Sequence, residues 1–231
     1  MKKIICALLL CCSLLFVGCG NKDKKTADYI GNHIIESRNN IYMGQDDNYY
    51  ATFCSGEREE PYELDGVVND KVPFGIITLS RHDNSKLSND EYLFTITING
   101  ESSSGTLVKS PYDNTYSADI EKSVDDNVEI SLKVNINGTH FSQNLYNESK
   151  NFEVSQEKAI EIASKELSNV LKEMSGKKTA EAMVKILKDY SGESNRYFWY
   201  VGLVGFDGKT AGVLIDAYTG EIVSVKLWDN N

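Results

Sequence analysis

The sequence predicts an α+β protein of two domains: an antiparallel β-sandwich, then a helix packed on an antiparallel sheet. Over residues 49–146 apolar and polar side chains alternate, which is the period of half-buried strands. The pattern changes at residue 151, and over residues 155–174 apolar side chains recur every three or four residues, as on one helix face. Four further stretches of strand type follow. The change of period divides the chain into domains at residues 28–150 and 151–231.

The first residues predict export and a lipid anchor. Two lysines precede an apolar run at residues 4–17, which is shorter than the about 20 residues that a membrane-spanning helix needs. The run ends in the string LFVGC, which resembles a bacterial lipobox. This resemblance implies that residues 1–18 are a signal peptide and that diacylated Cys19 holds the protein at the extracytoplasmic face of the cell membrane. An ordinary signal peptide cleaved elsewhere is the alternative. Residues 19–27 are polar and lysine-rich and are expected to form a tether.

Charge and cysteine content narrow the class of protein. The chain has 24 Lys and Arg against 34 Asp and Glu, and its net charge of −10 disfavours nucleic acid as a partner, because that partner needs clustered positive charge. Of the five cysteines, four belong to the signal sequence and lipobox. Cys54 is the remaining thiol, so no disulfide within the mature chain is expected. Its apolar neighbours favour a buried side chain over a nucleophile.

The expected sandwich follows a short helix at residues 27–36 and contains about seven strands. Two Asn-Gly pairs, at residues 99–100 and 137–138, stand after alternating runs and predict type I′ hairpin turns, since both residue types tolerate positive φ. Further strands are expected at residues 72–81, 105–110 and 116–120. A sandwich is the economical arrangement because the apolar face of each sheet must be covered by another.

The second unit opens with the best-defined helix of the chain. Ser155 is the expected N-cap, because its hydroxyl can accept a hydrogen bond from a free backbone N–H in the first turn. Strands are expected at residues 182–190, 197–206, 210–216 and 222–228, separated by Ser-Gly, Asp-Gly and Thr-Gly turns. The helix should therefore pack its apolar stripe on one face of an antiparallel sheet.

Two strings in this unit resemble the PepSY domain, a small extracellular module of bacteria. They are SQEKAIEIASKEL and, about fifty residues later, VLIDAYTGEIVSV, and the resemblance covers roughly residues 152–228. The matching positions are Ala159, Ala163, Ile215, Asp216, Ala217, Thr219, Gly220 and Glu221. The family is thought to act as a regulatory or inhibitory module near peptidases and the cell envelope, and the resemblance implies such a role here. Asp216, Thr219 and Gly220 are themselves expected to be structural residues of the turn.

No motif predicts a catalytic residue, a metal site or a cofactor. Two Ser-x-x-Lys strings match the spacing of penicillin-binding enzymes, but matches are expected by chance and the partner motifs of those enzymes are absent. The strings at residues 46–48 and 125–127 are expected to cap turns, with calcium binding as the less favoured alternative. The histidines are too scattered for a metal motif: His33, His82 and His140.

Two segments are candidates for partner binding. The consecutive aromatic residues Tyr197, Phe198, Trp199 and Tyr200 put large side chains on both faces of a strand. One face must meet the helix, and the opposite face is either an interdomain core or a partner site. The other segment is the charged loop at residues 55–62, where Arg58 and Glu59 are the candidates and a plain solvated connection is the alternative.

Together these patterns predict a lipid-anchored extracytoplasmic protein that binds an envelope protein or a peptidase. It would act as an interaction or regulatory module, with peptidase inhibition as one form of that role, and it would not be an enzyme. The alternative is a receptor for a cell-wall polymer or a small ligand, with the aromatic residues as stacking platforms. A cell-wall hydrolase is the least favoured class, because it would need a cleft of titratable side chains that no motif supplies.

Overall fold

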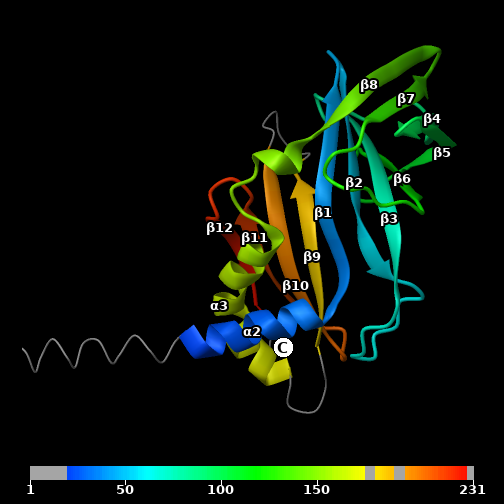
Figure 1. The fold of residues 1–231 in the computed structure, drawn as a ribbon. Helices are drawn as coiled ribbons and strands as arrows, with labels where there is room; N and C mark the ends of the chain where they lie inside the picture. Colours follow the sequence, from blue (N-terminus) through cyan, green and yellow to red (C-terminus); the bar gives the residue numbers. More distant parts are fainter. Residues whose placement is uncertain (1–19, 175–179, 190–195, 228–231) are drawn as a thin grey trace, which may run out of the picture.

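A computed structural model describes residues 20–174, 180–189 and 196–227. The elements run in the order α2 (Gly20–Asn32), β1 (Ile34–Gln45), β2 (Tyr49–Glu59), β3 (Lys71–Arg81), β4 (Glu91–Ile98), β5 (Glu101–Lys109), β6 (Tyr116–Ile120), β7 (Ile130–Ile136), β8 (Thr139–Asn147), the 3₁₀ helix η1 (Glu148–Asn151), α3 (Gln156–Met174), β9 (Ala180–Lys188), β10 (Tyr197–Gly205), β11 (Thr210–Asp216) and β12 (Ile222–Lys226). Figure 1 shows the two helices on one side of β9–β12, next to a curled sheet. The predicted signal peptide and Cys19 lie outside the described residues.

The first eight strands form a closed antiparallel barrel in the order β1-β2-β3-β6-β5-β4-β7-β8, and β8 pairs back to β1 where Met43 lies opposite Tyr146. The predicted β-sandwich is therefore wrong. The structure is mostly β, and it is not a sandwich joined to a separate helix-and-sheet domain. Alternation showed that each strand buries one face, but a sheet can also bury that face by closing on itself.

Side chains fill the barrel interior. The alternating residues of β4 are an example, since Tyr92, Phe94, Ile96 and Ile98 are all buried there. Both Asn-Gly hairpins are confirmed: they join β4 to β5 and β7 to β8, with Asn99 at φ 49° and Asn137 at φ 53°. The inward-facing residues form one continuous core, so this barrel has no central channel of its own.

The helix and four strands of the carboxy-terminal part form where the periodicity predicted them. The α3 helix begins after Ser155, whose hydroxyl accepts a hydrogen bond from the Lys158 N–H at 3.2 Å. Its apolar stripe, which includes Ala159, Ala163 and Leu167, packs on β9, β10 and β11. This layer is not separate from the barrel, because β9 pairs in parallel with the first half of β1 and makes one twelve-stranded sheet.

The strand β1 belongs to both cores. Its first half pairs with β9 and its second half with β8, and the pairing register shifts between Arg38 and Asn40. Tyr42 points into the barrel core, while Ile41 and Met43 belong to the core beneath the helices. The alternation within one strand thus connects the two parts of the molecule.

The segment before β1 is helical over a longer stretch than expected. Residues 20–27, which the sequence suggested as a tether, form the first part of α2, and the chain is already a strand at Ile34. Ile30 is fully buried, and α2 packs on α3. Among the described residues, neither helix has the length and apolar character that crossing a bilayer requires.

Candidate functional site

The aromatic strand β10 presents two of its four aromatic side chains to the helices. Tyr197 is fully buried and Trp199 is 3% exposed, both in the core beneath α3. The indole Nε1 of Trp199 donates a hydrogen bond to the Val154 carbonyl at 2.8 Å, just before α3 begins. These two residues therefore stabilise the fold and do not form an exposed surface, although Trp199 also lines a small hollow beside η1.

Phe198 and Tyr200 lie on the opposite face of the same sheet. The register places Phe198 beside Leu187 and places Tyr200 beside Leu214, and directly opposite residues share a face. Met183 and Val204 belong to this face as well. Phe198 is 8% exposed and the other five are partly exposed, so an apolar surface remains on the side away from the helices. We call this surface the Tyr200 face.

The Tyr200 ring is held in one position by two glycines. A Cβ atom at Gly202 would lie 2.5 Å from the Tyr200 hydroxyl, and one at Gly212 would lie 2.6 Å from the ring. The ring therefore rests on bare backbone of β10 and β11. A side chain at either position would displace it, so the glycines fix the shape of the Tyr200 face.

Arg58 and Glu59 lie on β2, which is separated from β10 by β9 and β1. Arg58 packs over the Phe74 ring, 4.8 Å from its centre, and donates to Asp119 at 2.6 Å. Glu59 is 3% exposed and accepts a hydrogen bond from the Asn69 N–H at 2.6 Å. The structure does not bring these residues together with the aromatic residues of β10.

A charged cluster lies on the Tyr200 face itself, because Lys185 stands directly opposite Tyr200 on β9. The Glu36 carboxylate contacts Arg38 and Lys185, each at 2.7 Å. Burial alone would raise the pKa of Glu36, but the two cations outweigh burial and lower it. Burial also lowers the pKa of Lys185, which Glu36 partly offsets. The charges of Glu36, Arg38 and Lys185 are paired with one another, so this cluster is read as structural.

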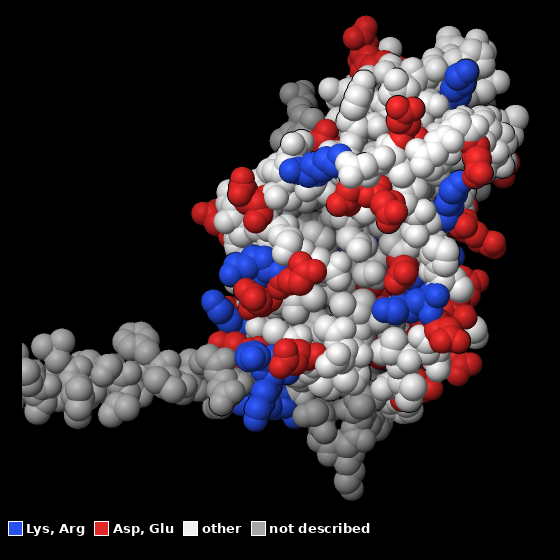
Figure 2. Space-filling view, viewed as in Figure 1, with Lys and Arg blue, Asp and Glu red and all other residues white. Residues whose placement is uncertain are grey.

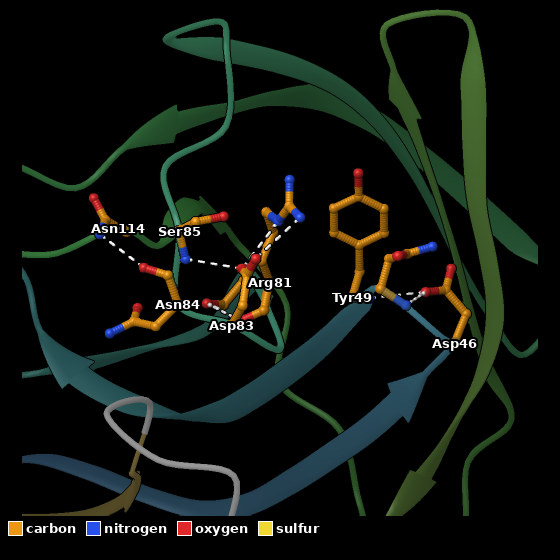
Figure 3. Close-up of polar contacts among 9 residues, drawn as sticks. Asp46, Tyr49, Arg81, Asp83, Asn84, Ser85 and Asn114 are labelled. Atoms are coloured by element: carbon orange, nitrogen blue, oxygen red, sulfur yellow. Dashed lines mark hydrogen bonds and ion pairs between the residues drawn. The ribbon is translucent and has the colours of Figure 1, made fainter.

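The acidic residues at the barrel rim serve turns. Figure 3 shows Asp46 beside the β1–β2 turn, where its Oδ1 accepts from the backbone N–H groups of Asn48 and Tyr49 at 2.9 and 2.8 Å. Asp83 holds the next turn by accepting from the Ser85 N–H and from Arg81. The Ser85 contacts and then the Arg81 charge lower the pKa of Asp83. Among the described residues, no three metal-ligating side chains come together.

The β11–β12 turn contains the residues that carry the PepSY resemblance. Asp216 Oδ1 accepts from the N–H groups of Tyr218 and Thr219, both at 3.0 Å. The Thr219 hydroxyl accepts from the Glu221 N–H at 3.2 Å, and Gly220 has φ 75°. The Asp216 and Thr219 side chains and the positive φ of Gly220 therefore stabilise the turn, as the sequence predicted.

Burial raises the pKa of two groups, Cys54 and Glu181. Burial raises the pKa of the Cys54 thiol to about 11, so the thiol stays protonated and unreactive at neutral pH. Glu181 is fully buried on β9 and accepts from the N–H groups of Asp65 and Gly66 at 3.1 and 2.8 Å. Burial, followed by the charge of Glu59, raises the pKa of Glu181. Sequence reasoning missed Glu181 because its loop partners are more than a hundred residues away.

A cleft lies at the barrel, where β7 begins and β8 ends. It has a volume of about 660 Å³. Its lining residues are mostly polar and include Thr97, Asp126, Asn127, Glu129, Ser131, Asn144, Tyr146, Asn147 and Lys150. Sequence reasoning assigned Asp126 and Asn127 to a turn and did not identify the others as parts of a site, because the lining comes from three separate segments.

No family model matches the chain, and no curated protein or solved structure matches it.

Proposed function

We propose that this protein is an extracytoplasmic lipoprotein, anchored through Cys19, that acts by binding a protein partner at the cell envelope and not by catalysis. The observation that carries the proposal is the Tyr200 face. One side of the β9–β11 sheet is buried under α3, while the other carries six apolar side chains, five of which are partly exposed. Aromatic residues on a rigid, partly exposed surface are characteristic of interface centres.

The membrane end of the molecule is consistent with this arrangement. Lys24 and Lys25 are exposed on α2, five and six residues after Cys19. Figure 2 shows basic side chains near α2, although acidic side chains lie among them and both signs of charge are found over the rest of this side. Basic residues next to a lipid anchor favour contact with an anionic bilayer, whereas the acidic body is repelled.

The PepSY resemblance directs the search for the partner. It suggests an extracytoplasmic peptidase, with inhibition as the consequence of binding. We expect the partner to contribute an apolar segment, because most of the side chains on the Tyr200 face are apolar.

The test is site-specific photocrosslinking in the anchored protein. A photoreactive residue at position 200 or 214 should give one crosslinked product of defined mass, and the same residue at Lys133, exposed on the barrel, should not. Leu214→Asp, which puts a charge on the Tyr200 face, should abolish the product obtained at position 200. Equal crosslinking at positions 200 and 133 would contradict the proposal. Cys19→Ala tests the anchor separately, because it should release the protein from membranes or leave it unprocessed.

A further inference from the structure

The barrel cleft contains polar groups that the protein itself leaves unused. The carboxylates of Asp126 and Glu129 and the amide of Asn144 are exposed, and within the described part of the chain they form no hydrogen bond or ion pair. Tyr146 lines the same cleft and is 70% exposed. Two acceptors with full charge, one amide and one aromatic ring are therefore available in a concave site of ligand size.

The walls of this cleft are nevertheless fixed. Lys150 donates to the Asn127 side chain at 2.7 Å, which holds the loop before β7 against η1. The Asn147 side chain donates to the Asp126 carbonyl at 3.1 Å and accepts from the Ser149 N–H at 2.9 Å. The free groups are thus presented from a hydrogen-bonded frame, which limits the conformational entropy that binding would cost.

A second hollow lies beside the cleft, at the first turn of α3. It has a volume of about 400 Å³ and shares Asp126 and Lys150 with the cleft. Its other polar lining residues include Asn39, Glu153, Gln156 and Glu157. We call the cleft and this hollow together the groove. Because the two hollows share lining residues, a ligand that occupied both of them would be elongated.

The charge of the groove disfavours anionic ligands. Among its described lining residues, Lys150 is the single base, and four residues carry carboxylates: Asp126, Glu129, Glu153 and Glu157. A ligand that carries ammonium groups gains charge-assisted hydrogen bonds here, while a phosphate or carboxylate would meet repulsion.

We propose that this groove binds a saccharide chain whose sugars carry hydroxyl groups and free amines. Carboxylates accept hydrogen bonds from paired hydroxyls and from ammonium groups, and the Asn144 amide can both donate and accept. The exposed ring of Tyr146 offers an apolar surface for the C–H face of a sugar ring. The site lies apart from the Tyr200 face, so it adds a ligand to the proposed protein partner and does not depend on it.

The experiment titrates the full mature chain by calorimetry with four defined probes. A glucosamine tetramer should bind, and its N-acetylated form should bind about tenfold more weakly, because acetylation removes the charge-assisted contacts. Tetralysine should also bind at least about tenfold more weakly, because it has charge without sugar rings. Tetragalacturonate, which is anionic, should not bind.

Matched variants locate the site. Tyr146→Ala and Asp126→Asn should each weaken the glucosamine tetramer about tenfold. Tyr112→Ala and Asp70→Asn are the controls: Tyr112 is 94% exposed, Asp70 is also exposed, neither lines the groove, and binding should not change. Because all four side chains are exposed, circular dichroism should show the same fold throughout.

Several outcomes would overturn the proposal. The first is that the glucosamine tetramer does not bind. The second is that tetralysine or the N-acetylated tetramer binds as tightly as the glucosamine tetramer. The third is that Tyr146→Ala binds the glucosamine tetramer as tightly as the unmodified protein does. Equal binding of tetralysine would mean that the groove responds to positive charge alone.

Discussion

Truncation of neighbouring aromatic residues on β10 should separate fold stability from partner binding. Trp199 is 3% exposed, and burial of a side chain of about 200 Å² at about 25 cal/mol per Å² corresponds to about 5 kcal/mol. Trp199→Ala also removes the donor to the Val154 carbonyl, which is worth about 1 kcal/mol. Because the cavity can partly collapse, we expect Trp199→Ala to lower the free energy of unfolding by about 3–5 kcal/mol.

Tyr200→Ala should behave differently although the two residues are adjacent. Its ring is partly exposed and rests on Gly202 and Gly212, so its loss leaves an open surface and no enclosed cavity. We expect a loss of about 1 kcal/mol in stability, together with a loss of about 2 kcal/mol or more in partner binding.

The assay is urea unfolding followed by far-ultraviolet circular dichroism, because Trp199 itself would confound fluorescence. The dependence of the free energy on urea should be the same in both variants and in the parent, so that the midpoints report stability alone. Equal destabilisation by Trp199→Ala and Tyr200→Ala would refute the assignment of the two faces. Crosslinking at position 214 in the Tyr200→Ala background then measures the binding loss.

Two further predictions concern the buried acid and the junction between the two parts. The raised pKa of Glu181 means that the native state binds the Glu181 proton more tightly than the unfolded state does, so the stabilising contribution of this residue is present below the ordinary glutamate pKa and is lost as pH rises through the raised pKa. Glu181→Gln should therefore increase the urea midpoint at pH 7 and flatten the pH dependence of that midpoint. The control Glu91→Gln, at an exposed position, should do neither. Ser149 in η1 accepts a hydrogen bond from the Ile41 N–H at 2.8 Å, and β1 belongs to both cores. We therefore expect the whole chain to unfold in one transition, and limited proteolysis should not cut the chain into two stable fragments at residues 147–151. Two resolved unfolding transitions would show that the two parts are independent.

The sequence was sufficient for features that depend on neighbouring residues. The positive φ values of Asn99 and Asn137, the cap at Ser155 and the stripe of α3 all follow from local chemistry. What sequence could not provide was the element that covers each apolar face. Period-two alternation is the same in a sandwich and in a barrel, and the closure depends on a pairing between Met43 and Tyr146, about a hundred residues apart.

The candidate sites show the same division. The four aromatic residues of β10 were visible, and their alternation required two faces, but which pair faced the helix depended on register. Glu181 gave no local signal, since it stands between Ala180 and Ala182 in an ordinary strand, and its partners come from the loop after β2. The barrel groove gave no motif either, because its free side chains are ordinary polar residues of a loop and a strand, and only the pairing of β7 with β8 brings them together.

The shared strand β1 also determines how the two proposed sites could influence each other. The Tyr200 face is attached to β1 through β9, and the groove is attached to it through β8, on either side of the register shift between Arg38 and Asn40. A ligand in the groove can change partner binding only if it binds two arrangements of this junction with different affinities. Two well-packed cores on the same strand resist such a change, because moving β1 disturbs both of them. We therefore expect the glucosamine tetramer to leave crosslinking at position 200 unchanged; a change of more than about threefold would show a second arrangement of β1, with a coupling free energy of about 0.7 kcal/mol or more.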